Sequence, residues 1–339
     1  MVDVFCGAGG LSLGLRDAGL TIAAGIDLDP ACRYPFEHNI GASFHGRDIM
    51  EVSATEVSAM FGEAPIRVLA GCAPCQPFSG YTTKRRESDG RWRLLLEFLR
   101  FVELVRPEII TLENVPRLTL LPLWGEFVRA LEALGYHVVW KVVDAADFGV
   151  PQNRRRVVLL ASRLGTIEMP KGTEQQHRTV RDEVFDRPPV EAGECDRQDR
   201  LHRARGLTAI NLERIRIAEP HGTWRCWPEH MRVKCHTELT GRTYPSVYGR
   251  MAWDKPSPTI TTQFYGFGNG RFGHPEQDRA LTLREGAMLQ SFPANFQFVP
   301  PGKPIVARTV GRLIGNAVPP ALGRAVGKAI IDHIRSQEN

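Results

Sequence analysis

Short aliphatic runs alternate with helix-like segments along the first 165 residues. Between these runs, apolar residues from Leu94 to Val105 repeat at helical spacing and stop before a proline, and those from Trp124 to Leu134 do the same and stop at a glycine. The strand-like runs are residues 2–5, 21–26, 68–70, 109–112, 137–143 and 157–161. Alternation of this kind predicts an α/β fold with a mostly parallel sheet and helices on both faces.

The pattern changes after residue 170. From about Lys171 to Pro258 the aliphatic runs are sparse, and Arg, Glu, His, Trp and Pro recur without a clear period. Such a segment predicts irregular structure, which suits a recognition surface. Residues 321–334 are helix-like again. We therefore predict a main domain built from residues 1–170 and 305–339, and a smaller, irregular domain built from residues 171–304.

Composition narrows the class of protein. The chain has 339 residues, of which 42% are hydrophobic, and this is enough to bury one large core or two unequal ones. No run approaches the roughly 20 apolar residues that cross a bilayer, and no cleavable signal precedes the first strand-like run. We therefore expect a soluble, intracellular protein without a membrane partner.

Cysteine content and charge refine this picture. The seven cysteines are an odd number at low density, so we expect reduced thiols and no metal site, although Cys72 and Cys75 form one C-x-x-C spacing. The net charge of +5 is too small to indicate a nucleic-acid partner by itself. Basic side chains nevertheless cluster at residues 84–86, 91–93, 154–156 and 197–216. Each cluster taken singly is more often a solvated face than a binding site.

Glycines and acidic residues follow the first strand-like runs. The letters VFCGAGG (residues 4–10) follow the first run, GIDLD (25–29) follows the second, and RDI (47–49) follows the next element. Glycines let the backbone approach a ligand at the carboxyl edge of a parallel sheet, and a carboxylate there can accept a hydrogen bond from a ribose. One glycine cluster alone is more often only a tight turn. Three such turns in order favour a cofactor that contains a nucleoside.

These three segments are similar to the cofactor site of the cytosine-5 DNA methyltransferase family, and further segments extend the resemblance. They are GCAPCQPFS (residues 71–79), TLENVP (111–116), QNRRR (152–156), REGAMLQSFP (284–293) and GNAVPP (315–320). The matches follow the family's order over residues 1–165 and 280–320, and they leave the middle third as its variable target-recognition region. The resemblance implies a Rossmann-like catalytic domain, S-adenosylmethionine as the cofactor, and double-stranded DNA as the substrate.

The same resemblance implies a covalent mechanism in which Cys75 is the nucleophile. A thiolate attacks strongly and also leaves readily. Cytosine C5 becomes reactive only after a group adds at C6, and this addition places electron density on the ring that a proton at N3 relieves. Glu113 ends a buried strand, where burial favours the protonated carboxyl that would hold N3. Arg154 and Arg156 are expected to orient Glu113 and O2 of the flipped base. A structural cysteine and a capping or salt-bridged glutamate are the ordinary alternatives for either residue alone.

Cofactor contacts carried over from the family lie in several separate segments. They are Phe5, Gly7, Gly9, Gly10, Asp27, Asp48, Ile49, Pro74, Leu94, Asn316 and Ala317. The chain departs from the family pattern at three positions. Asp27 occupies a position where Glu is usual, Ala73 replaces the first of two prolines, and Leu313 stands where Gln is frequent. None of these departures removes a reacting group.

DNA contacts are expected in two places. Residues 79–93 predict a basic loop that closes over the flipped target and contacts phosphates. Its candidate residues are Ser79, Lys84, Arg85, Arg86 and Arg91. Within residues 178–262, Arg250, Thr259 and Thr261 are the candidates for sequence recognition, although strand turns explain the same residues. The letters GFGNGR (266–271) either approach a backbone or turn a hairpin.

Three alternatives remain open from the sequence. The first is the same chemistry on RNA. The second is a catalytically silent binding homologue, which usually lacks the Cys or the Glu. The third is a Cys-dependent hydrolase, for which His38, His45 and His137 stand in no recognisable motif. We expect a monomeric enzyme of the bacterial cytoplasm, associated with the nucleoid, and a cognate restriction endonuclease acting separately.

Overall fold

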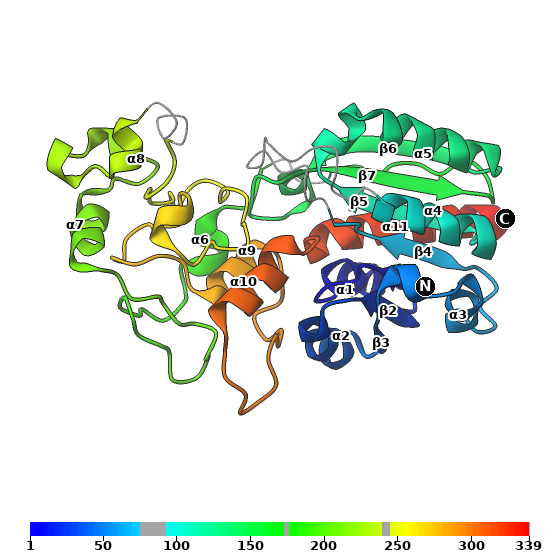
Figure 1. Cartoon of the computed structure of the whole chain (residues 1–339), viewed down its shortest axis with the longest axis horizontal. Coiled ribbons are helices and arrows are strands. Elements are labelled where there is room, and N and C mark those ends of the chain that lie inside the picture. Colours follow the sequence, from blue (N-terminus) through cyan, green and yellow to red (C-terminus); the bar gives the residue numbers. More distant parts are fainter. Residues whose placement is uncertain (75–92, 173–175, 239–244, 339) are drawn as a thin grey trace. The chain divides into compact units, whose positions relative to one another are not determined.

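The computed structural model describes residues 1–74, 93–172, 176–238 and 245–338, which form two compact units (Figure 1). Unit 1 comprises Met1–Phe148, Arg155–Glu174 and Ala317–Asn339, and unit 2 comprises Gly149–Arg154 and Gln175–Asn316. Helix α10 (Ala307–Asn316) therefore packs with unit 2. Because the units are defined by packing alone, the assignment of catalysis to residues 1–170 and 305–339 stays a prediction.

Unit 1 is built on a seven-stranded sheet in the order β3-β2-β1-β4-β5-β7-β6. Neighbouring strands are parallel except that β7 runs antiparallel to both β5 and β6. The strands are β1 (Val2–Val4), β2 (Ala24–Asp27), β3 (Ser43–Gly46), β4 (Val68–Gly71), β5 (Ile109–Asn114), β6 (His137–Asp144) and β7 (Arg155–Ser162). The predicted α/β fold with a mostly parallel sheet is confirmed. The pattern missed only β3, an edge strand that buries a single residue, Phe44.

Helices cover both faces of this sheet, because side chains alternate between the faces along each strand. In β5, Ile110 and Leu112 enter the core beneath α3 (Ala54–Met60), α4 (Arg93–Val105) and α5 (Pro122–Ala133). Ile109 enters the opposite core, beneath α1 (Gly10–Asp17) and α11 (Pro320–Glu338). Helix α2 (Arg33–Ile40) follows β2 and contacts β3. Among the residues that the structure describes, no helix has the length and apolar character needed to span a bilayer.

Glycines let α1 and α11 pack backbone to backbone. A Cβ atom at Gly14 would lie 2.2 Å from the carbonyl oxygen of Pro320 and 2.5 Å from the amide nitrogen of Arg324. A Cβ atom at Gly323 would meet the carbonyl oxygen of Leu11 at 3.0 Å. No larger residue fits at such a crossing without moving a helix. The C-terminal helix therefore packs on α1, in the first domain, as its sequence pattern predicts.

Unit 2 consists of short helices joined by long irregular segments. The helices are α6 (Val180–Val184), α7 (Ala209–Ile217), α8 (Lys234–Thr237), α9 (Leu283–Leu289) and α10, and the described residues of this unit contain only isolated β-bridges. Arg279 forms a buried ion pair with Glu285, with Nη2 2.8 Å from Oε1. Burial raises the pKa of Glu285, but the adjacent guanidinium outweighs burial and holds the pKa at about 2. Glu285 also completes the N-terminal capping box of α9 with Thr282.

Candidate active site

Three neighbouring strands, β4, β5 and β7, bring polar side chains together at one edge of the sheet. The pairing of Ala70 with Thr111 extends to Cys72, one residue past β4, and places it level with Glu113 on the same face. Arg156 lies two residues before Val158, the register partner of Glu113, and therefore shares this face as a diagonal neighbour. The edge is formed by the carboxyl ends of β4 and β5 and the amino end of antiparallel β7.

Both carboxyl oxygens of Glu113 are contacted. The thiol of Cys72 donates a hydrogen bond to Oε2, with Sγ 3.0 Å away, and Nε of Arg156 lies 3.0 Å from Oε1. The second contact is an ion pair without good hydrogen-bond alignment, since Oε1 accepts no hydrogen bond from any described residue. The structure thus brings Arg156 to Glu113, as expected from the sequence.

The segment that leads to Cys75 is held by Asn114, the last residue of β5. Its Nδ2 donates to the carbonyl oxygen of Ala73 at 3.0 Å, and its Oδ1 accepts the amide of Val115 at 2.8 Å. This buried amide fixes the backbone two residues before Cys75. Pro74 is exposed. Residues 75–92 lie outside the described part of the chain, and with them the predicted site residues Cys75, Ser79, Lys84, Arg85, Arg86 and Arg91.

Arg154 has a different setting from Arg156. Its guanidinium is buried in unit 2, where Nη1 donates to the carbonyl oxygen of Ile260 at 3.1 Å and Nη2 donates to that of Gly315 at 3.0 Å. Two carbonyl acceptors in one unit fit an architectural role. The role of Arg154 toward Glu113 that the resemblance implies stays a prediction.

The loop after β1 has an unusual backbone. Phe5, Gly7 and Gly9 all have positive φ, at 64°, 54° and 88°. A left-handed non-glycine residue such as Phe5 is strained, and strain of this kind concentrates at ligand sites. The amide of Gly7 donates to Oδ2 of Asp27 at 2.9 Å. A Cβ atom at Gly9 would lie 2.9 Å from Cγ1 of Ile40, so the loop also depends on glycine for space. Gly10 begins α1.

The predicted cofactor residues around this loop surround one apolar core. Ile49 is buried in it, and Phe5 and Leu94 pack against it. Asp27 ends β2, and its Oδ1 also accepts the amide of Asp29 at 2.9 Å. Asp48 caps the short helix Ile49–Glu51 by accepting the amide of Met50. Asn316 is exposed at the end of α10 in unit 2, and Ala317 is the first residue of the returning segment of unit 1.

A buried carboxyl group that the sequence analysis missed lies beside this loop. Asp3 is 1% exposed in β1, and Oγ of Ser12 donates to its Oδ2 at 2.5 Å. Burial raises the pKa of Asp3 to about 7; the Ser12 hydrogen bond opposes this shift and the nearby Asp27 adds to it. The signal was visible as a single aspartate between Val2 and Val4, two positions that a central strand buries.

In unit 2, the three residues predicted to contact DNA are engaged in internal contacts or partly buried. Arg250 is 5% exposed; its Nε donates to the carbonyl oxygen of Ile215, its Nη1 donates to that of His274, and its Nη2 pairs with Asp278. This setting is typical of a structural role, and the DNA contact of Arg250 stays a prediction. Thr259 donates from Oγ1 to the carbonyl oxygen of Asn153 at 2.7 Å. Thr261 is half-buried against Gly315.

Arg271 was not among the predicted DNA contacts, but its guanidinium has fewer internal contacts than that of Arg250. It is half-buried, its Nε is buried without a hydrogen-bond partner in the described residues, and its Nη1 lies 3.4 Å from Nδ1 of His221. Burial lowers the pKa of Arg271. The backbones of His221 and Tyr248 beside it have positive φ, at 63° and 58°. No carboxylate of the described residues forms an ion pair with Arg271 within 4.0 Å.

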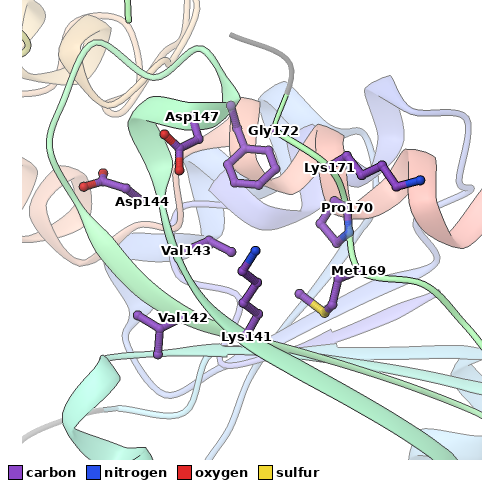
Figure 2. A pocket seen from close by; sticks show the side chains of 10 residues that line it. Lys141, Val142, Val143, Asp144, Asp147, Met169, Pro170, Lys171 and Gly172 are labelled. Atoms are coloured by element: carbon purple, nitrogen blue, oxygen red, sulfur yellow. The ribbon is translucent and has the colours of Figure 1, made fainter. Parts of the chain in front are cut away.

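A cavity of about 450 Å³ lies elsewhere in unit 1, at the end of edge strand β6 (Figure 2). Its walls include Lys141, Asp144, Asp147, Met169 and Lys171. None of the predicted site residues lines it, and β6 is separated from β5 by β7. It therefore does not mark the reaction centre. Within the described ranges no cluster of three His, Cys, Asp or Glu side chains could hold a metal ion.

Comparisons with known proteins match the chain over nearly its whole length. The family model described as C-5 cytosine-specific DNA methylase matches residues 1–332. The Type II methylase M.HgiDII of Herpetosiphon aurantiacus is 47% identical over 335 residues, covering 97% of this chain and 94% of the relative. The Type II methyltransferase M1.HphI of Haemophilus parahaemolyticus is 33% identical, covering 97% and 86%. Among solved structures, a putative DNA modification methyltransferase from an E. coli prophage superposes with a TM-score of 0.77 at 20% identity, covering 98% and 99%.

Proposed function

The chain belongs to the C-5 cytosine-specific DNA methylase family, and from that premise we propose how its residues carry out the reaction. It is a DNA (cytosine-5)-methyltransferase. We propose that it methylates a cytosine within a specific duplex sequence, with S-adenosylmethionine as the methyl donor. The observation that carries the assignment of the site is the contact of Glu113 with Arg156 and Cys72 at the end of β5. Strand β4 leads directly from this place toward Cys75.

In this proposal Cys75 adds to C6 of a flipped cytosine, so that the carbon–sulfur bond forms and electron density moves toward N3 and C5. Glu113 holds a proton at N3 and thereby stabilises this density. Arg156 fixes Oε1 of Glu113 and contributes positive charge beside the ring. Once C5 has accepted the methyl group, its proton passes to a base or water, and the electrons of the C5–H bond restore the C5–C6 double bond and expel the thiolate of Cys75.

The residues after β1 and β2 fit a nucleoside-containing cofactor. The glycine loop leaves open space for a close ligand at Gly7, where an added Cβ atom would meet no atom within 4 Å. A carboxylate has about four acceptor positions, so Asp27 can accept a ribose hydroxyl in addition to the two amides that it binds. Phe5 and Ile49 supply apolar walls. S-adenosylmethionine supplies an electrophilic methyl group on a sulfonium when bound. Titration calorimetry should detect its binding and a weaker affinity in Asp27→Ala.

Unit 2 is proposed to recognise the DNA sequence, with Arg271 in place of Arg250 as a contact. A guanidinium that is partly desolvated without a carboxylate partner is costly to keep in a fold. A DNA acceptor, either a guanine edge or a phosphate, would offset that cost. The strained backbone at His221 holds a second polar side chain beside it.

Several features of the cellular setting are proposals from the relatives. The relatives named Type II methylases favour DNA over RNA as the substrate. They also support a restriction-modification role in the bacterial cytoplasm, with a cognate endonuclease that acts separately. We expect a monomer, because one copy of the chain carries all the proposed site residues.

The test is transfer of labelled methyl from S-adenosylmethionine to duplex DNA, with a parallel RNA sample. The native chain should label cytosine C5 in DNA, and Cys75→Ser should not. DNA that contains 5-fluorocytosine should form an adduct that resists denaturation, because fluorine cannot leave as a proton does. Label on RNA alone would move the assignment to an RNA substrate, and label on neither would indicate a silent binding protein.

A further inference from the structure

Cys72 contacts the proposed acid directly, although neither the family resemblance nor the proposed mechanism uses it. It lies one residue past β4 and is half-buried, and its thiol donates to Oε2 of Glu113 at 3.0 Å. The contact follows from the sheet, since parallel pairing of β4 with β5 sets Cys72 and Glu113 side by side on one face. The register of the two strands therefore places any side chain at position 72 beside Glu113.

The two oxygens of Glu113 are contacted in different ways. Oε2 accepts the thiol proton, whereas Oε1 has the charge of Arg156 beside it but accepts no hydrogen bond from the described residues. The terminal torsion of a glutamate is broad, so one contact does not fix the plane of its carboxyl group. Two contacts on different oxygens do. The thiol of Cys72 on Oε2 and the guanidinium of Arg156 on Oε1 therefore set the orientation of the carboxyl group together.

We propose that Cys72 is a positioning residue for methyl transfer, whose thiol orients the Glu113 carboxyl group for its contact with cytosine N3. This inference rests on the proposed function of Glu113. Cys72 itself touches neither base nor cofactor in this proposal. It needs only its hydrogen and its position, so it remains a neutral thiol throughout the reaction and no bond to sulfur forms or breaks.

A set of single substitutions tests the inference in the full-length enzyme. Cys72→Ala removes the donor and should lower the single-turnover rate at saturating DNA and cofactor by roughly tenfold, the range of one hydrogen bond to a reacting group. The KM for DNA and the melting temperature should stay near native. Cys72→Ser keeps a donor and should recover most of the rate. Cys195→Ala, which removes a half-buried thiol in unit 2, is the matched control and should behave as native.

The rescue by serine separates positioning from packing. A merely structural role would lower stability or raise the KM for DNA, and it would not depend on the hydroxyl. If Cys72→Ala folds poorly, Cys72→Val fills similar space without a donor, and its rate compared with that of Cys72→Ser decides the question. Equal rates for native and Cys72→Ala, or for Val and Ser, would overturn the inference. A native enzyme that transfers no methyl to DNA would instead overturn the proposed function, so the two failures are distinguishable.

Discussion

Arg156 and Glu113 meet diagonally across the antiparallel pair of β7 and β5, with Nε 3.0 Å from Oε1. The side chains are only 14% and 6% exposed. An ion pair in such surroundings is costly to break, because removal of one partner leaves a buried charge without compensation. Arg156 lies near the start of β7, and Glu113 lies near the end of β5. The two positions meet at one edge of the sheet because β7 runs antiparallel to both of its neighbours.

The first prediction concerns Arg156. Arg156→Ala should lower the single-turnover rate by about 10- to 100-fold, a loss between those typical of an exposed and of a buried ion pair. Arg156→Lys retains the charge without the planar fork and should lose less. Arg155→Ala is the matched control, because Arg155 is exposed on the same strand. Rates of methyl transfer measured at saturating DNA check this, and an equal loss in Arg155→Ala would contradict it.

The second prediction separates Arg154 from Arg156. Arg154→Ala leaves the carbonyl oxygens of Ile260 and Gly315 without their donor in a buried place. The free energy of unfolding should therefore fall by about 2 to 4 kcal/mol, measured by urea denaturation. The folded fraction should still transfer methyl groups at a rate close to native. A native unfolding curve combined with loss of transfer would support the catalytic role that the family resemblance implies.

The third prediction compares two arginines of unit 2. Arg271→Ala should bind the recognition duplex about 5- to 100-fold more weakly with an almost unchanged melting temperature, because Arg271 has no carboxylate partner among the described residues to lose. Arg250→Ala should instead lower the melting temperature, since it breaks the contacts with Asp278 and three carbonyl oxygens. Binding measured over a salt series distinguishes a phosphate partner of Arg271 from a guanine partner. A phosphate contact reduces the salt slope by about one, and a guanine contact changes discrimination at one base pair. Native affinity in Arg271→Ala would remove it from the interface.

Sequence patterns predicted the helices and strands whose apolar residues recur at regular spacing. They also predicted site residues whose side-chain chemistry fits few other roles. Glu113 was identified because the segment TLENVP, at the end of a buried run, resembles a motif of the family. The partners of single arginines could not be predicted in this way. Arg154 and Arg156 are two residues apart in one run, yet one is held by carbonyls of unit 2 and the other by a carboxyl group of unit 1. Contacts with residues far along the chain determine the partner of each arginine, and the local sequence pattern does not encode these contacts.

The same reasoning applies to Cys72. Its spacing from Cys75 was visible, but its contact with Glu113 depends on the pairing of β4 with β5, which are separated by 37 residues of chain between Gly71 and Ile109. Arg250 was predicted to contact DNA because arginine is typical of such surfaces. Burial and the Asp278 pair, which only the folded chain reveals, are typical of a structural role.

The last prediction concerns pH and the buried carboxyl group of Asp3. Its pKa is about 7 in the folded chain and near 3.8 in the unfolded one, because burial disfavours the charge. Between these values the folded state keeps a proton that the unfolded state has lost, so this group makes the protein less stable as pH rises. Asp3→Asn cannot ionise, and its free energy of unfolding relative to native should increase steadily from about pH 4 to pH 7. Urea denaturation over this range measures the difference.

His274, whose pKa burial lowers to about 4, acts in the opposite sense, but it is present in both proteins and cancels in the comparison. Asp17→Asn, at an exposed position, should show no such trend, and a flat difference for Asp3→Asn would mean that the carboxyl group is ionised in the fold.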